Sequence, residues 1–373
     1  MKQFLHAIAT LSGLIIGVGI FGAPYVAAQA GFWIGLFWIV VVGVLVLTVH
    51  WFYGELIAST PGKHRLPGYV GYTFGKAGQR IVLITEVVRF WGLQLAYLIV
   101  GGMFLSLLLT PIFGGEAFTY SIILFIAVAT VSFFGLRLVA GVEFYLAWLL
   151  IGALLFISGR GLAHFDAQNL FTAGGGGWFG PYGVLMVSLS GAAAIPELWD
   201  IVKRRKGVFR RSIAVGTLVP VVVTALFMLA VVGVSGSNTS EEAISGLQGV
   251  LGPGIMALGA LTGFLAIITS YFVIALYLQE VLKYDFLVKH TPAWGFAAGI
   301  PLLLFLAGAR SFIDVIDVVG SVLFGLEGMV IVAAALALMR RRHASGLNWK
   351  VAAGIAAAAL MAVGAVQKLW QLL

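Results

Sequence analysis

The sequence predicts an all-α polytopic membrane protein with about 11 transmembrane helices. Hydrophobic residues make up 61% of the 373-residue chain, whereas charged residues make up only 10%. A soluble domain of this length needs far more charge to cover its surface, so we expect these helices to be solvated by the lipid bilayer. The charged residues stand in short blocks between long apolar runs, which is how a membrane protein arranges its loops.

Gly, Pro and charged residues separate the apolar runs, and a run of about 20 residues is long enough to cross the hydrocarbon core as a helix. We expect helices over residues 5–30, 33–57, 81–110, 119–136, 140–159, 178–202, 212–234, 253–283, 292–308, 312–339 and 349–371. Together they form a single transmembrane domain over residues 1–373. The first run has no small-residue cleavage site before the second, so we interpret it as a retained helix rather than a signal peptide.

Lys and Arg fall almost entirely on one side of these expected helices. With the N-terminus inside, only Arg160, Arg310 and Lys368 reach the outer side. Cytoplasmic loops carry the excess of Lys and Arg in membrane proteins, so we expect a cytoplasmic N-terminus and an outer C-terminus in the plasma (inner) membrane. The net charge of +8 therefore reflects topology, and nucleic acid is not expected as a partner.

Two of the expected helices carry helix-breaking residues around their midpoints. The first contains Gly13, Gly17, Gly19, Gly22 and Pro24. The sixth contains Ser188, Ser190, Gly191 and Pro196. These two helices run in opposite directions, and interrupted helices in matching places of two halves indicate an inverted-repeat transporter. We expect the first repeat over about residues 5–159, the second over about 178–339, and helix 349–371 outside the repeat.

The glycines of the first helix allow other interpretations. Residues 17–22 match the dinucleotide motif G-x-G-x-x-G, but no strand precedes them and the next carboxylate is Glu55, so no nucleotide cofactor is expected. Gly13 and Gly17 also have the spacing of a helix-packing pair. An unwound backbone at mid-depth is tolerable only where it lines a cavity, and its N–H and C=O groups suit the carboxylate and ammonium of a zwitterion.

Residues 12–25 read Ser-Gly-Leu-Ile-Ile-Gly-Val-Gly-Ile-Phe-Gly-Ala-Pro-Tyr. After Val26, residues 27–32 read Ala-Ala-Gln-Ala-Gly-Phe. This segment resembles helix 1 of the amino acid–polyamine–organocation superfamily. The number of helices is most similar to its amino acid/auxin permease and hydroxy/aromatic amino acid permease branches. The resemblance implies the leucine-transporter fold, with five plus five helices in inverted repeat, and secondary active transport of amino acids by alternating access.

The resemblance also implies where the substrate binds. Its carboxylate and amine are expected at Gly17, Val18, Gly19, Ile20 and Phe21 in the first helix. The matching break in the sixth helix comprises Val187, Ser188, Ser190, Gly191 and Ala192. Small residues at 192–194 leave room for a medium or large apolar side chain, which favours neutral, apolar or aromatic amino acids. Tyr97 is a candidate hydrogen-bond donor to the carboxylate, and ordinary packing is the alternative.

The eighth helix carries Thr269 and Ser270 near its middle. In sodium-coupled relatives a Thr-Ser pair at this place binds the ion, and the matching positions here are Gly13, Ile16, Ala266, Thr269 and Ser270. Neutral oxygens of this kind suit a hard monovalent cation, so the resemblance implies one Na⁺ site. The alternative is that both hydroxyls return hydrogen bonds to the preceding turn of their own helix.

Glu327 is the carboxylate nearest the middle of a span. A protonated Glu at this depth could carry a proton, which makes a proton-coupled permease the alternative to Na⁺ coupling. The structural interpretation of the same residue is a buried ion pair or hydrogen bond, with His50 and Arg89 as candidate partners.

The sequence also bears on two other classes of protein. An enzyme is not expected, because the spans lack paired carboxylates, His-rich metal spacing and a nucleophile elbow. A membrane receptor that senses amino acids on the same fold would use the same binding residues. Cysteine is absent, which excludes disulfides and Cys-based metal sites, and no cofactor is expected besides the coupling ion.

Overall fold

The computed structural model describes residues 2–135, 143–172, 174–341 and 347–373. Within these ranges every regular element is a helix, and none is a strand. The expected all-α fold class is therefore confirmed. Parts of the expected helices 119–136 and 140–159 lie outside the described residues.

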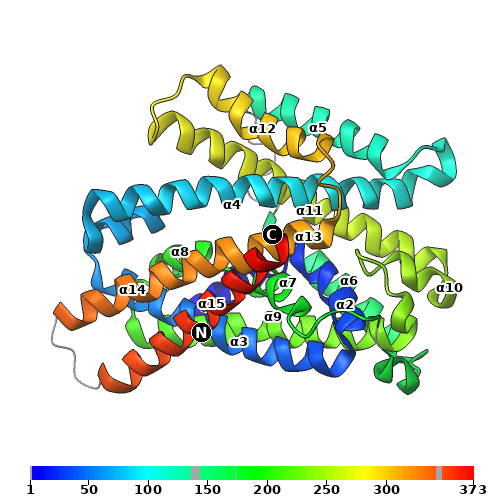
Figure 1. Ribbon diagram of the computed structural model, residues 1–373, viewed down its shortest axis with the longest axis horizontal. Coiled ribbons are helices and arrows are strands. Elements are labelled where there is room, and N and C mark those ends of the chain that lie inside the picture. The colour runs from blue at the N-terminus through cyan, green and yellow to red at the C-terminus, as the bar shows by residue number, and fades with distance from the viewer. Residues whose placement is uncertain (1, 136–142, 173, 342–346) are drawn as a thin grey trace.

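The first half of the chain forms six helices (Figure 1). They are α1 (Lys2–Ile15), α2 (Gly19–Ala30), α3 (Phe32–Ser59), α4 (Leu66–Phe113), α5 (Ala117–Phe133) and α6 (Glu143–Leu162). Only Gly31 separates α2 from α3, and its φ of 99° lies in a region that glycine adopts readily, which permits the reversal there. Gly75, with a φ of 71°, bends α4 before the expected helix 81–110 begins.

The second half begins with short helices and ends with long ones. It contains η1 (Ala167–Phe171), α7 (Gly180–Leu189), η2 (Ala192–Ala194), α8 (Ile195–Ile201), α9 (Lys206–Ser235), η3 (Gly236–Asn238), η4 (Ser245–Leu247) and α10 (Gln248–Leu251). It continues with α11 (Pro253–Tyr284), α12 (His290–Leu306), α13 (Phe312–Val318), η5 (Val319–Phe324), α14 (Gly325–Arg341) and α15 (Leu347–Leu372). The segment η5 is a π-helical turn inside the expected helix 312–339.

The number of spans agrees with the sequence. Among the described residues, seven helices are long and apolar enough to cross a membrane, and the bent pair α1–α2 makes an eighth span. Three shorter apolar helices cover Ala117–Phe133, Trp148–Leu162 and His290–Leu306. The total matches the prediction of about eleven spans.

Helix α4 runs between two groups of helices (Figure 1). It packs against α5, α11 and α12. In Figure 1, α5 and α12 lie above α4, and a bundle that includes α2, α3, α7, α9, α14 and α15 lies below it. The buried apolar side chains form two clusters, one that includes Tyr97 and Tyr271 and another that includes Phe52 and Leu185. Helices in lipid gain little from the hydrophobic effect when they associate, so close packing of small residues holds such bundles together. Gly35 of α3 illustrates this, because an added Cβ would lie 2.9 Å from the Ala27 Cα of α2.

Candidate functional site

The first transmembrane span is interrupted between α1 and α2. Helical geometry stops at Ile15 and resumes at Gly19, and the two helices are bent by 59° at the break. Across the gap, the Ile20 amide nitrogen lies 3.3 Å from the Gly17 carbonyl oxygen. The first N–H groups of a helix have no partner within that helix and form its positive end. The Phe21 amide nitrogen likewise lies 3.3 Å from the Val18 carbonyl oxygen, so both N–H groups have partners in the break. The break places the positive end of α2 inside the span.

The sixth span is interrupted between α7 and α8. Helix α7 ends at Leu189, Ser190 is extended with a ψ of 132°, and the chain re-enters helical geometry through η2. The Gly191 N–H donates to Nε2 of His50 on α3, at 3.1 Å. At this break a side chain from another helix thus takes over a hydrogen bond that the helix itself no longer makes.

The two breaks lie against each other. The Ser188 hydroxyl of α7 donates to the Gly19 carbonyl oxygen of α2 and also contacts the Val184 carbonyl oxygen. A Cβ added to Gly19 would lie 2.7 Å from the Cα and N atoms of Ser188, which is closer than real Cβ atoms come. A Cβ added to Gly191 would overlap the Ile15 side chain at the end of α1. Both halves of the first span therefore contact the interrupted part of the sixth.

The structure brings the predicted substrate residues to this junction. The gap between α1 and α2 and the first turn of α2 hold Gly17, Val18, Gly19, Ile20 and Phe21. The end of α7, the second gap and the start of η2 hold Val187, Ser188, Ser190, Gly191 and Ala192. The glycines differ, because the nearest atom to a Cβ added at Gly17 is 4.0 Å away. Gly17 borders open space, whereas Gly19 is packed against the facing backbone.

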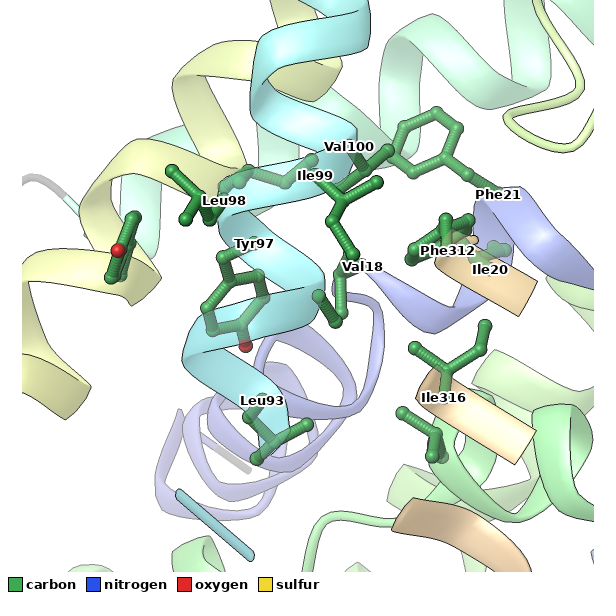
Figure 2. Packing of buried hydrophobic residues seen from close by; sticks show 14 of the residues in the cluster. Val18, Ile20, Phe21, Leu93, Tyr97, Leu98, Ile99, Val100, Phe312 and Ile316 are labelled. Carbon is green, nitrogen blue, oxygen red and sulfur yellow. The ribbon is translucent and has the colours of Figure 1, made fainter. Parts of the chain in front are cut away.

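Aromatic side chains surround the junction. Phe21 is fully buried, and its ring centroid lies 4.9 Å from that of Phe104 on α4 and 6.3 Å from that of Phe227 on α9. Tyr97 on α4 belongs to the same buried cluster, and its ring centroid lies 6.1 Å from that of Tyr271 on α11. Figure 2 shows Tyr97 and Phe21 within this cluster. Such surroundings suit an apolar or aromatic ligand group.

The expected space beside residues 192–194 is small. Ala192 borders a cavity that His50, Ser190 and Glu327 also line, and its volume is about 20 Å³. A cavity of this size holds one water molecule, not an amino acid side chain. Ala194 is buried and Ala193 is exposed, so the three alanines do not share one pocket.

The candidate ion ligands of α11 are engaged in local hydrogen bonds. The Thr269 and Ser270 hydroxyls both donate to the Ala266 carbonyl oxygen, at 2.9 and 3.1 Å. This is the arrangement that the sequence leaves as the alternative to an ion site. The other candidate ligands, Gly13 and Ile16, belong to α1 and its end, and α1 packs mainly against α9. The described part of the chain contains no group of three or more His, Asp or Glu residues that could hold a metal ion.

Glu327 lies in a buried charged cluster. Its Oε2 atom is 2.8 Å from Nε of Arg89 on α4, and another Arg89 nitrogen is 3.9 Å from Glu86 Oε1. The exposed fractions are 9% for Glu327, 6% for Arg89 and 6% for Glu86. Of the two candidate partners, Arg89 is therefore the one that pairs with Glu327, while His50 binds Gly191. Two carboxylates share one guanidinium here, so the cluster is neutral only when it also holds a proton.

The sequence pattern does not reveal the π-helical turn η5 or the contacts around it. Asp317, just before η5, accepts from the Ser321 hydroxyl and forms an ion pair of 2.6 Å with Lys368 of α15. A Cβ added to Gly320 would overlap the Gly183 carbonyl of α7, so the two backbones touch. Hydrophobic periodicity does not reveal a single π turn, and such turns are frequent at functional sites. In the sequence, Lys368 indicates only topology, whereas in the structure it pairs with Asp317.

The sequence profile of the tryptophan/tyrosine permease family matches residues 1–371. The chain belongs to this family. Membership of the tryptophan/tyrosine permease family indicates a membrane transporter rather than an enzyme, and it supports the expected superfamily class. The finer placement in the amino acid/auxin or hydroxy/aromatic amino acid branch stays a prediction.

One curated relative of this permease is the amino acid transporter AVT1H of Arabidopsis thaliana. The two are 31% identical over 84 residues. That stretch covers 22% of this chain and 19% of AVT1H, so the match spans about a fifth of the relative's length.

Three solved transporter structures share the fold of this permease. MhsT in complex with L-phenylalanine has a TM-score of 0.63 at 15% identity, with 98% of both chains covered. Mhp1, a nucleobase-cation-symport-1 family transporter in a closed conformation with bromovinylhydantoin bound, has a TM-score of 0.62 at 13% identity, with 98% of this chain and 92% of Mhp1 covered. The Eremococcus coleocola manganese transporter in complex with an aromatic bis-isothiourea substituted compound has a TM-score of 0.65 at 14% identity, with 98% and 86% covered. At these identities the likeness concerns the fold, and the expected leucine-transporter fold is confirmed.

Proposed function

We propose that this protein is a secondary active transporter of amino acids with neutral, apolar or aromatic side chains. The observation that carries the proposal is the contact between the two interrupted helices, where the Ser188 hydroxyl meets the Gly19 carbonyl. In inverted-repeat transporters the substrate binds where two discontinuous helices meet near the bilayer midplane. Such a junction can change shape when one bundle of helices rocks against the other, as alternating access requires.

The chemistry of the junction suits a zwitterion. The start of α2 is the positive end of a helix, which attracts a carboxylate. The end of α7 and the gap at Gly17 supply carbonyl oxygens, which accept hydrogen bonds from an ammonium group. Gly17 borders open space, so a ligand can approach its backbone closely. Neutral dipoles bind both charges of an amino acid without a buried countercharge.

The apolar surroundings support a preference for apolar or aromatic side chains. Phe21, Phe104 and Tyr97 are buried beside the junction. Membership of the tryptophan/tyrosine permease family points in the same direction, as does the likeness to MhsT, whose structure contains L-phenylalanine. The proposed location is the plasma membrane, with the N-terminus in the cytoplasm.

Uptake into proteoliposomes tests the proposal. Purified protein is reconstituted, and labelled L-tryptophan, L-tyrosine, L-phenylalanine and L-leucine are compared with L-glutamate and L-lysine. We expect uptake of the first group, competition among its members, and none by empty liposomes. Binding of these amino acids in detergent without any uptake would favour the receptor instead. The absence of both binding and uptake would exclude the proposal.

We propose Na⁺ as the coupling ion, bound by the Gly13, Ile16 and Ala266 carbonyls and the hydroxyls of Thr269 and Ser270. A hydroxyl oxygen keeps lone pairs while it donates, so it can still face a cation. Binding of one ion by Ala266 and both hydroxyls requires the hydroxyl hydrogens to turn away from the Ala266 carbonyl that they now contact. This site joins α11 to the broken first span, which would link ion binding to the substrate site.

A second candidate mechanism is proton coupling. It is supported by the cluster of Glu86, Arg89 and Glu327, where a single guanidinium faces two buried carboxylates. Burial disfavours the uncompensated negative charge, so a proton can be held there without a metal ion. Uptake driven by an imposed pH gradient in the absence of Na⁺ distinguishes this mechanism from the first.

A further inference from the structure

The imidazole of His50 joins three helices in the interior. His50 lies on α3 and is 1% exposed. Its Nε2 atom is 3.1 Å from the Gly191 amide nitrogen at the break of the sixth span. Its Nδ1 atom is 2.9 Å from the Thr217 hydroxyl oxygen of α9, which is fully buried. Both ring nitrogens therefore have a partner, and the two partners come from different elements.

The chemistry of these partners fixes the state of the ring. A backbone N–H can only donate, so Nε2 of His50 must accept and carries no hydrogen. The ring hydrogen then resides on Nδ1 and is donated to the Thr217 hydroxyl oxygen. A doubly protonated ring would set an N–H against the Gly191 N–H. The contact at Gly191 therefore requires the neutral imidazole.

The Gly191 N–H follows the end of α7 and is not part of the hydrogen-bond ladder of that helix. The extended geometry of Ser190 turns the following N–H out of the hydrogen-bond ladder of α7. Gly191 also lies against Ile15 and Leu11 of α1, because an added Cβ would overlap Ile15 and lie 3.3 Å from a Leu11 methyl carbon. The hydrogen bond that Gly191 donates to His50 thus lies where the sixth span touches α1, the first half of the first span.

We propose that His50 is a positioning residue for the substrate site. Its neutral imidazole holds the backbone of residues 188–192 in the interrupted conformation by accepting the Gly191 N–H, and Thr217 holds the imidazole in the required tautomer. This inference rests on the proposed function for its effect on substrate binding. The effect on the backbone of the break is independent of what the protein transports.

The small cavity beside His50 guides the choice of variants. The cavity is also lined by Ser190 and Glu327 and has room for one water molecule. A variant with a small side chain would admit more water, which could take over the Gly191 N–H. His50→Leu fills the space and offers no acceptor. His50→Gln keeps an acceptor at the position of Nε2, so it serves as the conservative rescue.

Hydrogen–deuterium exchange of the peptide covering residues 186–195 measures the effect on the break. We expect His50→Leu to raise exchange in this peptide about tenfold or more, because an amide that loses its buried acceptor opens more often. His50→Gln should exchange as the unaltered protein does. Thr217→Val should raise exchange less than His50→Leu, because the ring loses only the partner that fixes its tautomer.

A matched control is available on the same helix as Thr217. Thr224 is also fully buried on α9, and its hydroxyl has no hydrogen-bond partner among the described residues. Thr224→Val therefore removes a hydroxyl of the same kind from the same helix without touching His50. We expect no change in exchange over residues 186–195. An equal increase in Thr217→Val and Thr224→Val would overturn the role of Thr217.

Substrate affinity in detergent supplies the second measurement. We expect His50→Leu to weaken binding of the transported amino acid about tenfold, while His50→Gln stays within about threefold. Unchanged exchange and affinity in His50→Leu would overturn the inference. Equal losses of affinity in His50→Gln and His50→Leu would also overturn the inference, because a purely space-filling role of His50 predicts equal losses. If the unaltered protein binds no amino acid, the proposed function fails, while exchange in residues 186–195 still decides whether His50 holds the break.

Discussion

Ser188 of α7 donates its hydroxyl hydrogen to the carbonyl oxygen of Gly19 on α2, which joins the interrupted sixth span to the interrupted first. The two residues are 169 positions apart in the chain, and their backbones approach so closely that no side chain fits on Gly19. This contact bears on function, because both helices are interrupted where they meet.

The first prediction concerns Gly19. Gly19→Ala should destabilise the protein by about 1–3 kcal/mol, because the added Cβ would lie 2.7 Å from Ser188 backbone atoms and force the helices apart. Substrate binding should be lost with it. Gly17→Ala is the control, because its Cβ would meet nothing nearer than 4.0 Å. Thermal unfolding in detergent checks both variants, and equal melting temperatures for the two would contradict the expected clash.

The consequence for bulky substitutions differs between the two glycines. Gly19→Leu should disturb packing as well as binding, because its side chain would meet the Ser188 backbone. Gly17→Leu should fold and yet bind substrate at least about tenfold more weakly, because the side chain enters the space beside the break. Calorimetric titration with the transported amino acid measures this loss. A monodisperse Gly17→Leu protein with wild-type affinity would remove Gly17 from the site.

The second prediction concerns the coupling ion. Thr269→Ala and Ser270→Ala should each raise the Na⁺ concentration for half-maximal uptake, and the double variant should lose Na⁺ stimulation, because no fixed carboxylate compensates for a lost ligand. Na⁺ should also tighten substrate binding at equilibrium, since linkage between two ligands is reciprocal. Substrate affinity at matched ionic strength, with Na⁺ exchanged for choline, is the measurement.

A control for this prediction lies on the same helix. The Thr262 hydroxyl lies 2.7 Å from the Leu258 carbonyl oxygen and 3.2 Å from that of Gly259. It therefore returns a hydrogen bond to the preceding turn, as Thr269 does about two turns later. Thr262→Ala should leave the Na⁺ dependence unchanged. Equal substrate affinity in Na⁺ and choline for all variants would show that Thr269 and Ser270 only return hydrogen bonds to their own helix.

The third prediction concerns the buried charged cluster. Arg89→Gln should destabilise the protein more than Glu327→Gln, because it leaves two buried carboxylates without a cation, at a cost of about 3–5 kcal/mol. Glu327→Gln leaves Arg89 with Glu86, which lies 3.9 Å away. Thermal unfolding ranks the two variants, and a smaller loss for Arg89→Gln would contradict the ion-pair description.

Uptake by Glu327→Gln separates the two coupling mechanisms. With Na⁺ coupling, the variant should keep its Na⁺ stimulation at a reduced rate. With proton coupling, uptake should stop and its pH dependence should disappear, while Na⁺ has no effect on either protein. Glu327 should therefore matter less for uptake than the Thr269–Ser270 pair if Na⁺ is the coupling ion.

The fourth prediction concerns Glu241, in the loop before α11. Burial raises the pKa of this carboxyl above its ordinary value of 4.5, partly offset by a hydrogen bond from the Phe312 backbone. The folded state therefore binds the proton more tightly than the unfolded state, and this contribution to stability is lost as pH rises through the folded pKa. Glu241→Gln should make unfolding less dependent on pH above about 4.5. Melting temperatures from pH 4 to pH 8 for both proteins test this, and parallel curves would contradict it.

Much of the fold follows from the sequence because membrane helices obey a strong constraint. Backbone polar groups cannot face lipid unpaired, so apolar runs of sufficient length must be helices. Their ends follow from Gly, Pro and charge, as for α11, expected over 253–283 and observed over Pro253–Tyr284. The interruption of the first span also follows, because its glycines and Pro24 concentrate where helix propensity is lost.

What only the tertiary structure decides is how side chains distant in the chain meet. By itself the sequence determined the number of helices, the two interrupted spans and the residue types at each break, because these depend on local composition. It left both Arg89 and His50 as candidate partners of Glu327, and packing assigned Arg89 to Glu327 and His50 to Gly191. It also identified Gly17 and Gly19 alike, although one borders open space and the other touches Ser188. Such distinctions depend on the relative placement of whole helices, which local composition does not encode.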